Sequence, residues 1–71
     1  MPNAKYWNIY TADGHYVGQS AAFTAKTAFC QYMFVTGKQI AEDDVKFEGR
    51  DDEAERLKYQ SEEFVVIPQV I

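Results

Sequence analysis

The side chains that could perform catalytic chemistry are few in this sequence, and their spacing does not favour it. His15 is the single histidine, and no cysteine stands near it at the spacing of metal ligands. Cys30 is the single cysteine, within a segment that predicts a helix and away from the helix N-terminus that would lower the pKa of a thiol. A charge-relay arrangement would have to use His15, beside the Asp13-Gly14 turn signal. We therefore expect no catalytic residue, no cofactor and no enzymatic activity.

Clustered carboxylates between residues 42 and 55 are the second group with chemical potential. The candidates for an acidic surface are Glu42, Asp43, Asp44, Asp51, Asp52, Glu53 and Glu55. They lack the alternating ligand positions and the mid-loop glycine of an EF-hand. The glycines of the chain stand singly, so no glycine-rich loop is available to bind a phosphate group. We expect a solvated acidic surface without a bound metal.

Residues 5–22 carry the clearest structural signal in the chain. Two aromatic-rich runs, 5–11 and 15–21, flank Asp13-Gly14, and this pattern predicts a β-hairpin. A two-residue turn would mix polar and apolar side chains on each face of the hairpin. A three-residue loop over 12–14, with Gly14 in the left-handed conformation, separates them.

The three-residue loop is the predicted one, because a register slip of one residue would move every side chain to the opposite face. It pairs Thr11 with His15, and it pairs Ile9 with Val17. The apolar face then consists of Trp7, Ile9, Val17 and Ala21. The opposite face carries Tyr6, Tyr10 and Tyr16, which are the candidate interaction residues of the hairpin.

A single long helix is expected to follow, with Thr24 as its N-cap and Gly37 as a left-handed C-cap. Ser20 is an alternative N-cap that would start the helix four residues earlier. The stripe expected to pack on the sheet is Ala25, Ala28, Phe29, Tyr32, Met33 and Thr36. The side opposite this stripe, where polar residues are normal, carries the other interaction candidates, Cys30 and Phe34, with Phe23 close by.

The second half of the chain predicts a connection, a strand, a short helix and a last strand. Residues 38–44 read as a polar connection with room for one helical turn, and residues 45–48 alternate as a half-buried strand that ends at Gly49. Residues 50–59 predict a short surface helix capped by Asp51 or Asp52. Its contacts would be made by Ala54 and Leu57. Residues 64–67 read as a strand covered on both faces and ended by Pro68.

These elements predict an α+β fold, a mostly antiparallel sheet of three or four strands with the long helix packed on one face. The expected order is an N-terminal β-hairpin, the long helix, a strand, a short helix and a C-terminal strand. With 71 residues, of which 46% are hydrophobic, the chain fits a single folded domain over 1–71, with 1–4 as a flexible arm. One cysteine allows no intramolecular disulfide, and no signal-like segment opens the chain, so we expect a cytoplasmic protein.

The composition and the surplus apolar side chains favour a binding protein. Formal net charge is −4, so a phosphate backbone should be repelled, and no membrane partner or small-molecule substrate is indicated. We expect a non-catalytic protein-interaction module, either a homodimer or a subunit or modulator of a larger complex, acting through exposed aromatic surface. One alternative is an acidic decoy, an inhibitor of a nucleic-acid-binding protein of the kind carried by phages and mobile elements. The other is single-stranded nucleic-acid binding by the tyrosine-lined face.

Overall fold

The computed structural model describes residues 5–69, so the predicted arm over 1–4 lies outside the described residues. The α+β class is confirmed, but the sheet has five strands where three or four were predicted. The elements in chain order are β1 (Lys5–Thr11), β2 (Tyr16–Ala22), α1 (Ala25–Val35), the 3-10 turn η1 (Glu42–Asp44), β3 (Val45–Asp51), β4 (Ala54–Tyr59) and β5 (Glu62–Pro68).

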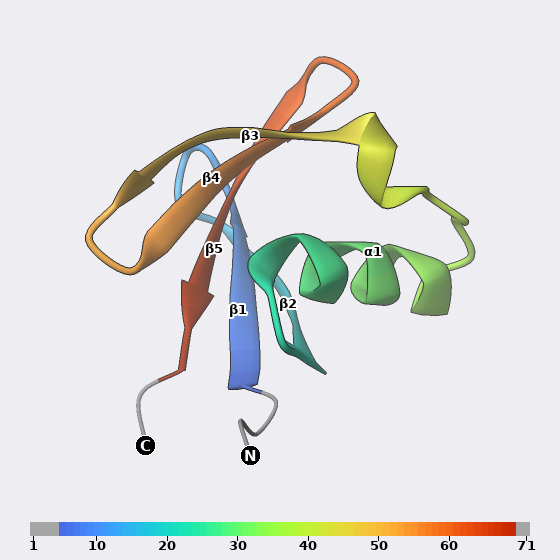
Figure 1. The fold of residues 1–71 in the computed structure, drawn as a ribbon, viewed down its shortest axis with the longest axis horizontal. Helices are drawn as coiled ribbons and strands as arrows, with labels where there is room; N and C mark the ends of the chain where they lie inside the picture. The colour runs from blue at the N-terminus through green and yellow to red at the C-terminus, as the bar shows by residue number, and fades with distance from the viewer. Residues whose placement is uncertain (1–4, 70–71) are drawn as a thin grey trace.

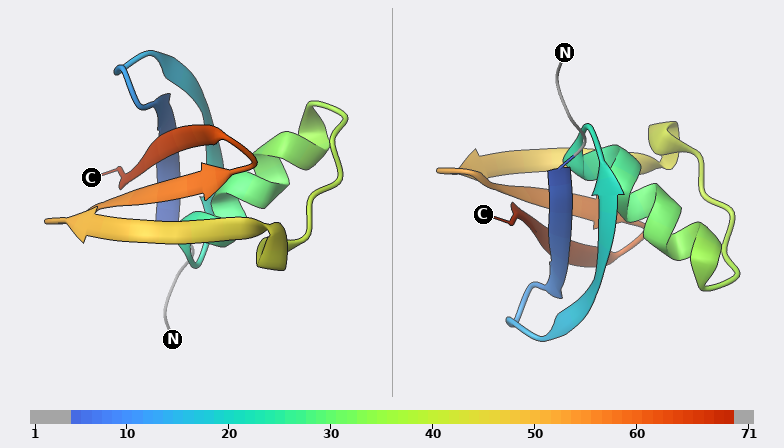
Figure 2. Two further views of the ribbon diagram at one scale, coloured as in Figure 1. Left: turned by 90° about the horizontal axis from the view of Figure 1, so that it is seen from above. Right: turned by 90° about the horizontal axis from the view of Figure 1, so that it is seen from below.

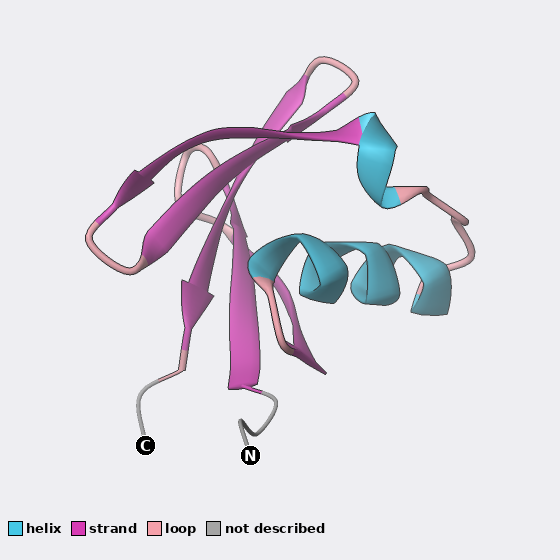
Figure 3. Ribbon diagram, in the orientation of Figure 1, coloured by secondary structure: helices cyan, strands magenta, loops and turns pink. Residues whose placement is uncertain are grey.

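The sheet is antiparallel throughout, in the order β2-β1-β5-β4-β3. Within the sheet, β1 pairs with β5 and so joins the first strand to the last (Figure 1). Trp7 lies opposite Pro68, and Thr11 lies opposite Phe64. The sheet is strongly twisted, so that β3 and β4 cross the direction of β1 and β2 (Figure 2). α1 lies in the space between β2 and η1, and it covers one face of the sheet (Figures 1 and 3).

The core lies between α1 and the sheet face that it covers. Its buried side chains are Trp7, Ile9, Ala22, Ala25, Ala28, Phe29, Val45, Leu57, Phe64 and Val66. Phe29 is the centre of this cluster, with its ring centroid 4.8 Å from that of Phe64 and 6.4 Å from that of Tyr59. The indole Nε1 of Trp7 donates to the carbonyl of Ala22 at 3.0 Å, so the one buried indole donor has an acceptor.

The hairpin has the predicted three-residue loop but a different register beyond it. The amide of Thr11 donates to the carbonyl of His15 at 2.8 Å, and Gly14 has φ +95°. A β-bulge then shifts the pairing, so that Ile9 lies opposite Gly18 and not opposite Val17 as predicted. The extra residue reverses the alternation of β2, and the buried alanine is therefore Ala22, where Ala21 was predicted.

Helix α1 is capped at both ends as the sequence predicts. The hydroxyl of Thr24 accepts from the amide of Thr27 at 3.1 Å, while the alternative cap Ser20 lies within β2 and is wrong. At the other end the backbone amide of Lys38 donates to the carbonyl of Met33, and the amide of Gly37 donates to the carbonyl of Phe34. These two bonds form a Schellman motif around Gly37, whose φ of +101° favours glycine. Of the predicted stripe, Thr36 alone is exposed.

The predicted helix over 50–59 is wrong, because this segment forms the end of β3, a tight turn and β4. β3 does not end at Gly49 as predicted, since a bulge next to that glycine carries the strand on to Asp51. Asp52 then takes φ 61°, a left-handed turn conformation that aspartate tolerates. β4 pairs with a strand on each side, and Leu57 becomes fully buried, which outweighs the weak local helix preference.

The predicted strand over 64–67 is confirmed and is longer, but it is not covered on both faces. Phe64 and Val66 face the core and are buried, whereas Ile67 is 37% exposed. In the part of the chain that the structure describes, α1 covers one face of the sheet, and no element covers the opposite face of β5. The predicted helical turn before β3 is confirmed as η1.

Gly18 provides a direct test of how α1 seats against β2. A Cβ on Gly18 would overlap the ring of Tyr32, within 2.7 Å of its Cζ, and the hydroxyl of Tyr32 holds that ring by donating to the carbonyl of Val17 at 3.0 Å. We expect Gly18→Ala to lower the free energy of unfolding by about 1–3 kcal/mol in urea denaturation. The same substitution in a Tyr32→Ala background should cost clearly less. An equal cost in both backgrounds would contradict this packing.

Candidate functional site

The sheet face opposite α1 is the first candidate site, and we call it the open face. Trp7 and Ile9 point into the core, so the residues that alternate with them in β1 point the other way. Cross-strand partners share a face, so the register of β2 and β5 against β1 assigns the other residues of the open face. Its members are Tyr6, Asn8 and Tyr10 of β1, Tyr16, Gln19 and Ala21 of β2, and Val65 and Ile67 of β5.

The structure brings Tyr6, Tyr10 and Tyr16 to this one face. Tyr10 and Tyr16 are cross-strand partners on the loop side of the bulge, and their rings meet edge to face with centroids 5.6 Å apart. Tyr6 is 52% exposed and Tyr16 is 59% exposed. Since an edge-to-face pair restricts both rings, Tyr10 and Tyr16 form a pre-ordered aromatic pair on this face, with Tyr6 further along β1.

Side-chain amides fill the gap between the tyrosines on the open face. The Nε2 group of Gln19 donates to the Oδ1 atom of Asn8 at 3.1 Å and also donates to the Oε1 atom of Gln69. These bonds tie β2, β1 and the residue after β5 together across three neighbouring chain segments. The face therefore combines rigid aromatic rings with ordered amide groups, which is a composition common at protein-binding surfaces.

Charges on the open face are mixed and lie toward β3 and β4. Arg56 lies opposite Val65, Lys58 lies opposite Glu63, and Lys46 lies opposite Lys58. The Nε atom of Arg56 is 3.4 Å from a carboxylate oxygen of Asp51. Lys5 alternates with Tyr6 and lies on the other face of β1. The basic and acidic side chains are thus interleaved, and they do not form a continuous basic track.

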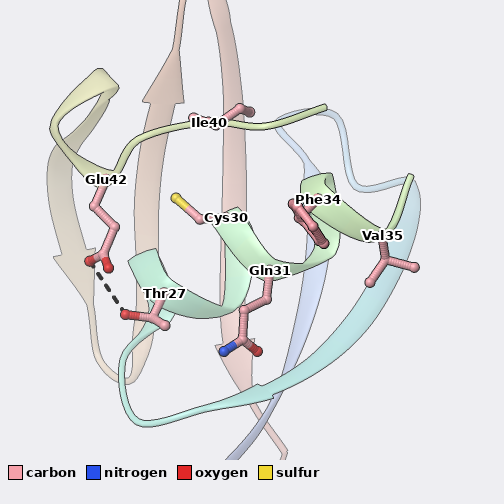
Figure 4. Close-up of a pocket in the computed structure, with 7 residues that line it drawn as sticks. All are labelled: Thr27, Cys30, Gln31, Phe34, Val35, Ile40 and Glu42. Atoms are coloured by element: carbon pink, nitrogen blue, oxygen red, sulfur yellow. Dashed lines mark hydrogen bonds between the residues drawn. The ribbon is translucent and has the colours of Figure 1, made fainter. Parts of the chain in front are cut away.

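The outer side of α1 forms the second candidate site, an open groove of about 480 Å³ that we call the α1 groove (Figure 4). Its lining residues are Thr27, Cys30, Gln31, Phe34, Val35, Ile40 and Glu42. Cys30 and Phe34 are brought together as neighbours on α1, and the segment after the helix places Ile40 over them. Phe23 is 66% exposed but does not line the groove.

Cys30 is a neutral, half-buried part of this groove. Burial raises the pKa of its thiol, the carboxylates of Glu42 and Asp44 raise the pKa further, and Lys26 opposes them. A raised pKa keeps the thiol protonated and weakly nucleophilic near neutral pH. Among residues 5–69, no three histidine, cysteine, aspartate or glutamate side chains are grouped so that they could hold a metal ion.

The predicted acidic residues are divided between the two ends of β3. Glu42, Asp43 and Asp44 form η1 before the strand, while Asp51, Asp52 and Glu53 lie at its far end. A strand of seven residues separates the two groups by about 20 Å. Glu55 is half-buried and pairs with Arg50 at 3.1 Å. The acidic-decoy alternative stays a prediction, and the carboxylates that it invokes form two separate clusters.

His15 lies at the exposed hairpin tip in a small hydrogen-bonded group. Its Nδ1 atom is 3.0 Å from one carboxylate oxygen of Asp13, and the hydroxyl of Thr11 donates to the other oxygen. The Thr11 hydroxyl also accepts from the amide of His15 at 3.1 Å. All three side chains belong to the turn itself, so this group stabilises the loop.

Sequence reasoning missed the contributions of β5 and of the segment after α1. Ile67 and Val65 join the tyrosines because β5 pairs with β1, a contact between opposite ends of the chain that no local pattern reveals. Ile40 completes the α1 groove, and its signal was a single isoleucine in an otherwise polar connection.

No protein-family model matches this chain, and no curated protein or solved structure matches it either. Within residues 5–69 no helix has the length and apolar character needed to cross a bilayer, since α1 has 11 residues. The function is therefore inferred from the two surfaces.

The titration of Asp13 tests the hairpin-tip geometry. Hydrogen bonds from Thr11 and His15 lower the pKa of Asp13 below its ordinary value of 3.8. The lowered folded-state pKa means that these contacts stabilise the loop above pH 3.8, and that this stabilisation is lost as pH falls through the folded-state value.

We expect the carboxyl ¹³C shift of Asp13 to titrate below pH 3.8, and Thr11→Val to raise the midpoint toward that value. Thr36→Val, which removes a hydroxyl at the end of α1, is the control and should leave the Asp13 titration unchanged. An Asp13 titration midpoint that does not change in Thr11→Val would show that the Thr11 hydroxyl does not bind the Asp13 carboxylate.

Proposed function

We propose that this chain is a non-catalytic protein-interaction module that forms a homodimer through the open face. The observation that carries the proposal is the strip of exposed Tyr6, Tyr16 and Ile67 on a sheet face that no described element covers. An antiparallel sheet with one solvated face normally presents polar side chains there. Here β1 and β5 present tyrosine, valine and isoleucine instead, which favours a surface that is covered in use.

Tyrosine supports a protein partner for this face. Its ring offers large rigid area at low conformational cost, and its hydroxyl remains compatible with water before assembly. The Tyr10–Tyr16 edge-to-face pair lowers the ordering cost further, because both rings are already held at 5.6 Å. The amides of Asn8 and Gln19 add hydrogen-bonding groups at the centre of the strip.

A second copy is the partner that the charges favour. The chain carries a formal net charge of −4, which would make two copies repel each other. On the open face, however, Lys46, Arg56 and Lys58 are interleaved with Asp51 and Glu63 beside the tyrosines, so charges of opposite sign are available at the edge of the proposed interface. A two-fold axis would pack the tyrosine strip against its own equivalent, as in sheet-on-sheet packing.

Sedimentation velocity tests the dimer. We expect the wild-type chain to sediment as a dimer at micromolar concentration, and Tyr16→Asp to raise the dissociation constant at least about tenfold, because a buried charge would replace an aromatic anchor. Phe34→Asp introduces the same charge on the opposite side of the molecule and is the matched control. A wild-type chain that stays monomeric, or a dimer that Tyr16→Asp leaves intact, would contradict the proposal.

Binding of single-stranded nucleic acid is the second candidate, and one observation favours it. Lys46, Arg56 and Lys58 share the open face with the tyrosines, so basic side chains and stacking platforms occur together. The interleaved Asp51 and Glu63 and the net charge of −4 weigh against it, because nucleic acid requires a net positive path for its backbone.

Fluorescence anisotropy of a labelled single-stranded oligonucleotide tests this candidate at low salt. Trp7 is buried in the core and is not a suitable reporter, so the label belongs on the nucleic acid. Binding by the open face should weaken about tenfold in Lys46→Gln with Lys58→Gln, and should weaken as salt is added. Lys38→Gln, after α1, is the control. Absence of binding at low salt would remove this candidate.

A further inference from the structure

The α1 groove lies on the helix side of the sheet, away from the open face, and the proposed dimer would leave it free. Its apolar part is formed by Phe34, Val35 and Ile40, and Cys30 lies next to them on the side toward Glu42 (Figure 4). Phe34 is 66% exposed and Val35 is 82% exposed, although both belong to the one long helix of the fold. Isolated exposed apolar side chains are ordinary, but these are contiguous and lie in a concave surface.

The groove is built from restrained parts. Thr27 donates from its hydroxyl to Glu42 at 3.3 Å, which links α1 to η1 at one end of the groove. The Schellman bonds around Gly37 fix the direction in which the chain leaves α1 at the other end. Ile40 packs against the core cluster from the connecting segment. A groove restrained at both ends loses little conformational entropy when it binds a partner.

Carboxylates are concentrated at the η1 end of the groove. Glu42 lines the groove, and Asp43 and Asp44 follow it directly in η1. None of these carboxylates forms an ion pair with any residue between 5 and 69. Lys26 is the cation that acts on Cys30, and burial together with the carboxylates of Glu42 and Asp44 outweighs it. The groove therefore presents an apolar end near Phe34 and an anionic end at Glu42.

We propose that the α1 groove binds a basic, amphipathic segment of a partner protein, which inserts an apolar side chain beside Phe34 and Ile40 and places a lysine or arginine beside Glu42. Charge complementarity selects this partner, because a second copy of this acidic chain would bring further carboxylates to the anionic end. A helix laid into a groove with apolar anchors is a common mode of peptide recognition.

The spacing of the two ends specifies the segment further. Thr27, which bonds Glu42, and Phe34 are seven positions apart on α1, which corresponds to about 10 Å along the helix axis. A helical partner would cover this distance with an apolar and a basic residue about seven positions apart. An extended partner would need about three positions.

The probe is a labelled helical peptide of about 15 residues with leucine and lysine seven positions apart. Its binding is measured by fluorescence anisotropy and mapped by ¹⁵N chemical-shift changes. We expect shifts at residues of α1 and η1, and affinity that falls between about 50 and 500 mM salt. Phe34→Ala should weaken binding at least about tenfold, because it removes the aromatic anchor. Glu42→Gln with Asp44→Asn should weaken binding several-fold and flatten its salt dependence.

Matched controls distinguish binding in the groove from non-specific binding elsewhere on the surface. Phe23→Ala removes a phenylalanine of equal exposure, 66%, that lies outside the groove, and it should leave binding unchanged. Asp52→Asn removes a carboxylate at the far end of β3, and it should also have no effect. A peptide in which glutamate replaces the lysines should bind at least about tenfold more weakly.

Three outcomes would overturn the proposal: no binding of the lysine peptide, equal binding of the glutamate peptide, or chemical-shift changes confined to the open face. The groove and the dimer are tested separately, because Tyr16→Asp should weaken dimerisation at least about tenfold and leave peptide affinity unchanged. A loss of peptide binding in Tyr16→Asp, with the fold retained, would place the peptide on the open face.

Discussion

Pairing between β1 and β5 is the contact on which the rest of this structure depends. It joins the N-terminal hairpin to the β3–β4–β5 meander, and it places Trp7 beside Pro68 and Ile9 beside Val66 at the centre of the sheet. Without it, the hairpin would be a two-stranded sheet, and the meander would expose the apolar edge that β1 now covers. The contact also determines the function that we propose, because it sets Ile67 beside the tyrosine-bearing strand.

Within residues 5–69, one helix covers a five-stranded sheet, and this ratio leaves apolar side chains exposed. α1 provides Ala25, Ala28 and Phe29 to the core and covers the face that holds Leu57 and Val66. The opposite sheet face and the outer side of α1 have no further layer among the described residues. A chain of 71 residues buries a smaller share of its surface than a larger domain does, so apolar residues on both surfaces are available for partners.

The two surfaces have different chemistry and lie on opposite sides of the molecule. The open face combines tyrosine rings and amides with charges of both signs, which suits a second copy of the chain. The α1 groove combines an apolar end with carboxylates that form no ion pair within residues 5–69, which suits a basic segment.

The sequence by itself determined the features that depend on neighbouring residues. The loop after Thr11, the left-handed Gly14, the cap at Thr24 and the Schellman turn at Gly37 were predictable, because each follows from local backbone preference. The tyrosines could also be assigned to one face, since alternation along β1 is local and Tyr16 lies next to the loop. The bulge at the hairpin was not predictable, because its extra residue, Val17, is held by a hydrogen bond from Tyr32 of α1, which the hairpin sequence does not contain.

Only the tertiary structure decided the conformation of residues 54–59 and the exposure of Ile67 and Ile40. Residues 54–59 have charges in the order that suits a helix, yet they form a strand because β3 and β5 provide partners on both sides and Leu57 becomes buried. Ile67 was predicted to be buried but is exposed, because α1 packs on the other face of β5. Ile40 became part of a groove because the chain returns over α1 before β3. Long-range pairing and burial outweigh local preference at these positions, since their free energies exceed the small differences in helix and strand propensity.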